Sequence, residues 1–319
     1  MLKLAHYRQI GDDPADQMVA ALVSDQGLGV LRQLMPELSD FHQATDKVPD
    51  IVKDLREKLS FDLDLNTKKK IIRATRFYTN QEENIGLVLG LYALPYCYLG
   101  ADGAKVLYLS ARIKNDTYQR LKETGAFLNA VLNLDNWENG QVFTIIAKVR
   151  LLHAFIRYFT IQSGKWDLSW GYPINQEDML GTNLAFSYIV LKGLEKMGIA
   201  VDEQSQKSYY FIWQKIGVLL GILPELIPLN RADSFRLDAQ ISKRQFRSSK
   251  EGIALTASLT EMYGQWAPNE WTKELFMSQT RYLLGQKYAD MLEIPETKVP
   301  IELLNTYHQT KAFFSKILN

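Results

Sequence analysis

The chain has 319 residues, of which 46% are hydrophobic, 11% aromatic and 23% charged, and these fractions are typical of a folded globular protein with a large core. Its 37 basic and 36 acidic residues are interspersed, so the sequence offers no global field that would attract nucleic acid. The densest basic run, Lys68-Lys69-Lys70 with Arg73, is more typical of a solvated helix face than of a binding site. We therefore expect no nucleic-acid partner.

Cys97 is the only cysteine, which excludes an intrachain disulfide and a thiolate-only metal site and suits a reducing compartment. The first residues lack the apolar run of a signal peptide. The most apolar stretch, residues 85–99, contains Pro95 and is shorter than the roughly 20 residues that a membrane-spanning helix needs. The sequence therefore predicts a cytoplasmic protein without a transmembrane segment.

Helix-start signals recur along the chain. Asp13-Pro14-Ala15-Asp16 combines a capping side chain, a proline at the first helical position and an acidic residue in the first turn. The helix that starts at Asn175 is expected to run to Met197 and to end at Gly198. Similar signals predict further helix starts near Asn115 or Asp116, Asp202, Ser249, Asn269 and Pro300.

One segment, residues 142–149, is rich in β-branched residues and is open to two interpretations. Its apolar positions continue with the three- and four-residue spacing of a buried helix, so we predict a helix there. No other stretch shows the sustained alternation of a β-strand, and no repeat or flexible linker divides the chain. The sequence predicts an all-α protein that forms a single helical domain over residues 1–319.

Several common catalytic motifs are absent. The four histidines, at positions 6, 42, 153 and 308, form no His-Glu-x-x-His pair, which argues against a zinc hydrolase. The chain also lacks the glycine-rich motifs of dinucleotide and P-loop sites and the Gly-x-Ser-x-Gly of α/β-hydrolases.

His153 lies on the apolar face of the helix predicted around residues 142–156, with Arg150 about one turn before it and Arg157 about one turn after it. Two neighbouring cations favour neutral imidazole, the form that binds a metal, and the same arginines could pair with the carboxylates of a haem. The alternative is a core histidine hydrogen-bonded to the backbone, with arginines that are solvated or ion-paired.

Two other helices carry candidate site residues. Arg120, Glu123, Thr124 and Phe127 share one face, which could form the opposite wall of a cavity or a surface cluster that supports the helix. Tyr209, Trp213, Gly217 and Gly221 fall four residues apart, and two glycines inside a helix indicate close approach of a neighbouring helix or of a flat cofactor.

The order and spacing of these motifs resemble those of the haem b-dependent latex-clearing proteins (rubber oxygenases) and the oxygenase of mycophenolic acid biosynthesis. The resemblance covers roughly residues 8–225 and leaves 226–319 as a helical C-terminal extension. The matching segments are Arg8 to Asp12, Arg120 with Thr124, Val149 to Ala154 with Arg157, Trp170 to Met179, and Trp213 with Gly217 and Gly221.

The resemblance implies an all-α fold with a globin-like core and one haem b. It implies that His153 is the proximal ligand of the haem iron, that Arg120 and Thr124 lie near the other haem face, and that Arg150 belongs to the haem site. Arg157, Trp213 and Gly217 are further candidate haem contacts. The expected reaction is oxygenation of an apolar alkene or isoprenoid substrate by O2.

The chain departs from the rubber-cleaving members in the residue before Thr124. Those members have a lysine there, whereas this chain has Glu123, which could act as a distal base. The rubber-cleaving members are also secreted and the mycophenolate enzyme is membrane-anchored, so we expect a different substrate.

Asp178 is expected to cap its helix rather than to act in catalysis. The alternatives are a haem-binding sensor or carrier, and a helical interaction protein without cofactor.

Overall fold

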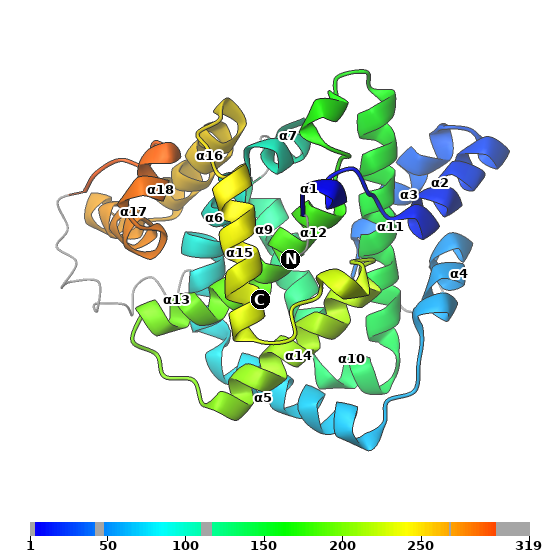
Figure 1. The fold of residues 1–319 in the computed structure, drawn as a ribbon, viewed down its shortest axis with the longest axis horizontal. Coiled ribbons are helices and arrows are strands. Elements are labelled where there is room, and N and C mark those ends of the chain that lie inside the picture. Colours follow the sequence, from blue (N-terminus) through cyan, green and yellow to red (C-terminus); the bar gives the residue numbers. More distant parts are fainter. Residues whose placement is uncertain (1–3, 42–47, 110–116, 268, 298–319) are drawn as a thin grey trace.

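The computed structural model describes residues 4–41, 48–109, 117–267 and 269–297, and these ranges contain helices and connecting loops but no strand (Figure 1). This confirms the all-α prediction. The helix starts expected near Asn115 or Asp116 and at Pro300 lie outside the described residues. The elements are α1 (Leu4–Tyr7), α2 (Asp13–Gln26), α3 (Gly29–Ser39), α4 (Asp50–Leu59), α5 (Leu65–Val88), η2 (Leu89–Ala93), α6 (Leu94–Tyr98), α7 (Ala101–Leu109), α9 (Thr117–Val131), α10 (Leu134–Glu138), α11 (Gln141–Gln162), η3 (Leu168–Trp170), α12 (Gln176–Leu184), η4 (Ala185–Ile189), α13 (Val190–Lys196), α14 (Glu203–Leu219), η5 (Pro224–Leu226), α15 (Arg231–Gln245), α16 (Lys250–Trp266), α17 (Glu270–Leu284) and α18 (Gln286–Met291).

The predicted helix starts of α12, α14, α16 and α17 are confirmed by their capping bonds. In each case a side-chain oxygen accepts a hydrogen bond from the backbone N–H three residues later, at 2.9 to 3.1 Å. These bonds satisfy N–H groups that have no partner within the helix. The capping residues are Asn175, Asp202, Ser249 and Asn269.

The start of α2 differs from the expected pattern by one residue. The helix already includes Asp13, so Asp12 occupies the capping position, and the Asp12 side chain makes no capping bond. Its carboxylate binds Arg150 instead, at 2.6 and 2.7 Å. The Asp12 side chain therefore forms a long-range ion pair in place of the local capping bond that a residue at this position usually makes.

The segment that could have been a strand lies within α11, a long helix at the centre of the fold. One face of α11 packs on α2, α3 and α4 through a separate apolar cluster that includes Val19, Leu31, Val52, Leu151 and Phe155 (Figure 1). α11 also contacts α9, α10 and α14. It thus connects this smaller cluster with the rest of the molecule.

The main apolar core is built by α5, by α14, and by two continuous helical segments. The first leads from α5 through η2 into α6, and the second leads from α12 through η4 into α13. α5 packs along α14, and the chain then passes through the π-helical turn η2 into α6. The helix expected from Asn175 to Met197 contains a second π-helical turn, η4, between α12 and α13. η2 and η4 contact each other inside the core. None of the described helices is long and apolar enough to cross a membrane.

Gly221 does not lie inside a helix, as the four-residue spacing had suggested. α14 ends at Leu219, and Gly221 has φ +93° in the turn that follows. A Cβ atom there would lie 2.4 Å from Oδ2 of Asp12 and 2.9 Å from Nε of Arg150. Glycine is therefore required both by the backbone conformation and by the close approach of this ion pair.

Candidate functional site

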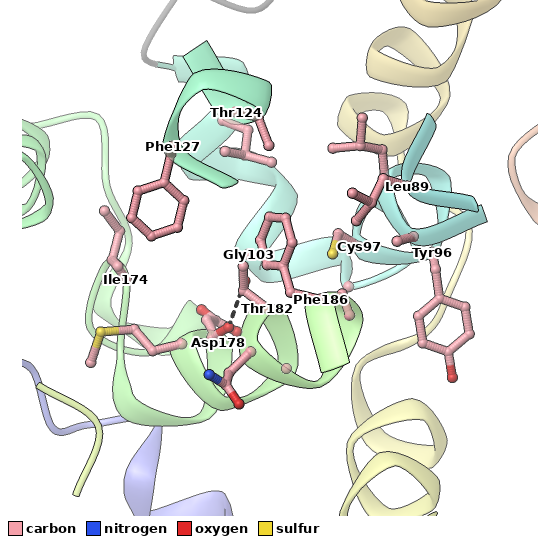
Figure 2. A pocket seen from close by; sticks show the side chains of 18 of the residues that line it. Leu89, Tyr96, Cys97, Gly103, Thr124, Phe127, Ile174, Asp178, Thr182 and Phe186 are labelled. Carbon is pink, nitrogen blue, oxygen red and sulfur yellow. Dashed lines mark hydrogen bonds between the residues drawn. The ribbon is translucent and has the colours of Figure 1, made fainter. Parts of the chain in front are cut away.

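A cavity of about 370 Å³ lies between α11, α9, α6, α12 and α15, and its volume is within the usual range of small-molecule sites. Figure 2 shows Phe127, Ile174 and Phe186 around the same opening, with Leu89 and Cys97 on the neighbouring wall. Most of the other lining side chains are also apolar. They include Ala93, Leu94, Leu128, Leu152, Ile156, Met179 and Ile222.

His153 borders this cavity from α11. Its Nδ1 atom is enclosed and has no hydrogen-bond partner among the described residues. Burial, together with the nearby charges of Arg157 and Arg120, lowers the pKa of the imidazole to about 3. The ring is therefore neutral near pH 7 and retains its capacity to bind a metal. Among the described residues Nδ1 thus has no backbone partner of the kind that the alternative of a core histidine would provide.

The cavity wall formed by α9 carries Arg120, Glu123 and Thr124, which is one of the two alternatives that their shared helix face left open. Nη1 of Arg120 donates to Oε2 of Glu123 at 3.1 Å, and Oγ1 of Thr124 donates to the Arg120 carbonyl at 2.9 Å. Because the charge of Arg120 acts on the pKa of His153, the two side chains are close enough to share one site. The structure thus brings α9 and α11 together around the cavity.

The side chains of Arg150 and Arg157 do not line the cavity. Both bind carboxylates at the start of α2. Arg150 binds Asp12, while Nε of Arg157 donates to Asp16 at 2.6 Å. The two arginines are therefore engaged by the protein's own carboxylates, which differs from the expected pairing with cofactor carboxylates. Arg157 still contributes its positive charge to the surroundings of His153.

The helix α14 contributes Trp213 but not Gly217 to the cavity lining. The indole of Trp213 stacks on Phe186, with ring centroids 5.1 Å apart and an angle of 12°. A Cβ atom on Gly217 would lie 2.9 Å from side-chain atoms of both Asn183 and Ile227. The glycine therefore admits protein side chains, and the expectation that it approaches a flat cofactor is corrected.

Two segments that were noted in the sequence for their family-like pattern, 8–12 and 170–179, pack against each other. The N–H of Tyr172 donates to the Arg8 carbonyl at 2.6 Å. The side-chain Nε2 of Gln176 donates hydrogen bonds to the backbone carbonyls of Gly11 and Gly221, at 2.8 and 2.9 Å. These bonds hold the loop that precedes α12, and α12 forms part of the cavity wall.

Asp178 lies at the third position of α12 and borders the cavity, and its carboxylate makes no bond to the backbone N–H of Asn175. Its N–H donates to Oδ1 of Asn175, and its carboxylate accepts hydrogen bonds from Asn175 and from Arg8, the latter at 2.9 Å. Figure 2 shows Asp178 beside Thr182 at the cavity wall. Burial is the main cause of a raised Asp178 pKa, which the Arg8 charge partly offsets.

No sequence pattern predicted the π-helical turns η2 and η4, which also contribute to the cavity wall. Each turn has a backbone carbonyl that accepts a hydrogen bond from a buried tyrosine hydroxyl. The Tyr263 hydroxyl donates to Gly90 at 2.6 Å, and the Tyr209 hydroxyl donates to Phe186 at 2.9 Å. Gly90 and Phe186 both line the cavity. Such turns are frequent at functional sites, but the tyrosines that bind them come from distant helices.

The described residues contain no group of three or more His, Cys, Asp or Glu side chains that could hold a metal ion. Cys97 lies at the cavity wall, where burial raises the pKa of its thiol to about 12. It is therefore a neutral wall residue at physiological pH.

Known proteins resemble this chain in sequence and in fold. The chain is 22% identical to a rubber oxygenase from Streptomyces sp. (strain K30) over 303 residues, which are 93% of this chain and 74% of that protein. The solved structure of latex clearing protein LCP in the closed state superposes with a TM-score of 0.78 at 21% identity, covering 98% of this chain and 84% of the other. That likeness shows the shared fold. The family model described as "ER-bound oxygenase mpaB/B'/Rubber oxygenase, catalytic domain" matches residues 89–310, well over half of the sequence, so the chain belongs to this oxygenase family.

Proposed function

We propose that the protein is a haem b-dependent oxygenase in which His153 would hold the haem iron and O2 would oxidise an apolar alkene or isoprenoid substrate. The observation that carries the proposal is the buried, neutral His153 ring at the edge of an apolar cavity, with Nδ1 lacking a partner. Haem, when bound, supplies the activation of O2. Membership of an oxygenase family supports the same reaction class.

The residues around the cavity fit a haem better than a metal ion held by several side chains. Haem needs one protein ligand, and His153 is the lining residue suited to that task. Arg120 is the cationic side chain on the cavity wall, where it can bind a negatively charged group. We do not assign Arg150 and Arg157 to the haem carboxylates, because each already binds an aspartate.

The apolar walls would hold the substrate by burying its hydrocarbon surface and by limiting the access of water. The stacked pair of Trp213 and Phe186 offers a rigid wall for this purpose. Thr124, at the cavity beside Arg120, offers a hydroxyl whose proton is already directed to the backbone of its own helix. Its remaining capacity is to accept a hydrogen bond from a bound group.

Glu123 is our candidate for a base that removes a proton next to the substrate double bond, since its carboxylate lines the cavity. Its ion pair with Arg120 opposes this task, because proton uptake by Glu123 weakens the pair. The competing role for Glu123 is to position Arg120.

The two rival functions are a haem sensor or carrier, and a helical interaction protein without cofactor. A sensor needs no space for an organic substrate, so O2-dependent turnover distinguishes it from the oxygenase. The cytoplasmic location stays a prediction from the sequence.

The deciding experiment is to express the full chain with adequate haem supply, record its absorption spectrum and measure O2-dependent turnover of an isoprenoid alkene. We expect a Soret band from about one non-covalent haem b per chain, since the sequence has no Cys-x-x-Cys-His for covalent attachment. A protein that stays colourless with added hemin contradicts the proposal. Haem binding without O2-dependent product supports the sensor or carrier instead.

A further inference from the structure

The cavity has a polar side on α15, apart from the side formed by α11. Asp238, Ile241 and Gln245 are spaced three and four residues apart, so they share one face of α15, and all three line the cavity. In Figure 1, α15 and α11 are clearly separated, with α12 between them. The cavity therefore extends from the His153 side to a second set of side chains on α15.

Asp238 differs from the other carboxylates of the cavity in its partners. Its side chain is buried, with 8% of the residue exposed, and Oδ1 accepts a hydrogen bond from the Tyr96 hydroxyl at 2.8 Å. Within the described ranges it has no cation within 4.0 Å, although the charge of Lys192 acts on it from farther away. By contrast, the other carboxylates each pair with an arginine: Glu123 with Arg120, Glu177 with Arg244 and Asp178 with Arg8.

Gln245 adds an acceptor without a donor to the same face. The residue is 7% exposed, and its Oε1 atom is enclosed without a hydrogen-bond partner among the described residues. A buried acceptor left without a hydrogen bond is unfavourable, so a bound group that donates a hydrogen bond would recover this loss. The second oxygen of Asp238 likewise has no hydrogen bond in the described part. Two acceptors on one face of α15 thus lack donors.

We infer that this face of α15 is a subsite for a terminal hydrogen-bond donor, a hydroxyl or an ammonium group, on an otherwise apolar molecule. The inference rests on the proposed function only in treating that molecule as the substrate. The hydrocarbon body lies against the apolar walls, and its donor end reaches Asp238 and Gln245. A carboxylate in the same position offers no donor and is rejected, because the acceptors on α15 stay unbonded.

The test compares probes that share an alkyl chain and differ in the end group: n-octanol, n-octylamine, methyl octanoate and octanoate. Their binding to the purified full chain is measured by calorimetry. We expect n-octanol or n-octylamine to bind at least about tenfold more tightly than methyl octanoate and octanoate, which corresponds to one hydrogen bond of ordinary strength. Preference for the alcohol assigns a hydroxyl, and preference for the amine assigns an ammonium group. Equal affinities, or tightest binding of octanoate, overturn the inference.

Variants then locate the preference. Asp238→Asn and Gln245→Leu are each expected to reduce the discrimination between the donor probes and methyl octanoate to about threefold or less, while methyl octanoate binds as before. Asp233→Asn and Gln240→Leu, on the same helix but outside the cavity lining, serve as matched controls. If the Asp238→Asn variant loses its far-UV helical signal, the end-group discrimination of the Gln245→Leu variant alone tests the inference. Unchanged discrimination in a folded Gln245→Leu variant contradicts the subsite.

This outcome is separable from that of the proposed function. Probe binding requires neither haem nor turnover, so the α15 preference can hold in a protein that takes up no haem. Conversely, a haem-loaded protein with O2-dependent turnover and no end-group preference leaves the proposed function intact and removes the α15 subsite.

Discussion

The guanidinium of Arg150 binds both carboxylate oxygens of Asp12, with Nε 2.6 Å from Oδ2 and Nη2 2.7 Å from Oδ1. Nη1 of the same arginine donates to the Leu219 carbonyl at 3.2 Å. The pair therefore joins the start of α2, the middle of α11 and the end of α14. Because Asp12 is buried, this is a bidentate ion pair in the interior and not a surface contact.

Replacing Asp12 by asparagine is expected to destabilise the fold by about 3 to 5 kcal/mol, because Arg150 would keep its charge in a buried place without a counter-ion. Urea unfolding of the haem-free chain measures this loss. The matched control is Asp13→Asn, an exposed position in the first turn of α2, for which we expect a change of at most about 1 kcal/mol. Similar losses in the two variants would show that the Asp12–Arg150 ion pair contributes no more to the free energy of unfolding than the exposed Asp13 does.

His153→Ala is expected to abolish stable hemin binding while the far-UV helical spectrum largely survives, since the lost interaction is chiefly metal ligation. Spectral titration with hemin and circular dichroism measure the two properties. Substitution of the remaining histidines, at positions 6, 42 and 308, should leave hemin binding in place. A His153→Ala protein with the wild-type Soret band would move the ligand to another residue.

The stability of the haem-free protein should depend on pH through His153. Its pKa falls from 6.5 to about 3 in the folded state. Between these values the unfolded chain binds the additional proton, so this contribution to stability is lost as the pH falls below 6.5. From pH 6.5 to pH 5 the loss is about 2 kcal/mol.

The comparison needed for that pH effect is between the wild type and His153→Asn. Burial raises the pKa of carboxyl groups such as Asp178 and Asp238, and these groups act in the opposite direction because the folded state binds their protons more tightly. They are present in both proteins, so the difference isolates His153. Urea unfolding at the two pH values should show the steeper loss in the wild type. Parallel losses would contradict a neutral His153 in the fold.

Glu123→Gln distinguishes a catalytic base from a residue that positions Arg120. If Glu123 takes a proton from the substrate, the variant should keep haem and O2 binding but lower single-turnover rates by roughly a hundredfold or more. If Glu123 only pairs with Arg120, the rate should be nearly unchanged and stability should shift by less than about 1 kcal/mol. Glu138→Gln, on α10 and outside the cavity lining, is the control at matched haem content.

The tyrosine hydroxyls that bind the π-helical turns should contribute to stability. Tyr263→Phe and Tyr209→Phe each remove the donor to a buried carbonyl, which we expect to cost about 1 to 3 kcal/mol in thermal or urea unfolding. The control is Tyr282→Phe, whose hydroxyl binds the Lys196 carbonyl at an exposed site, with an expected change within about 0.5 kcal/mol. Equal effects at all three positions would mean that the carbonyls of η2 and η4 find other donors.

Sequence patterns were most informative where the determining interactions are local. The capping residues Asn175, Asp202, Ser249 and Asn269 predicted four helix starts, because the bond that fixes each start spans three residues. Apolar spacing predicted that residues 142–149 are helical, and the three- and four-residue spacing in α9 predicted that Arg120, Glu123 and Thr124 share one face. The resemblance of these motifs to an oxygenase family also agrees with the family to which the chain belongs.

The partners of these side chains were decided only by the tertiary structure. Arg150 and Arg157 suggested cofactor carboxylates, but the fold brings Asp12 and Asp16 to them from more than a hundred residues away. Gly217 meets Asn183 and Ile227 rather than a cofactor, for the same reason. Local spacing shows which residues share a helix face, whereas which helix meets that face depends on how the whole chain packs. The π-helical turns and the acceptors on α15 belong to this second class, since their roles arise from contacts between distant helices.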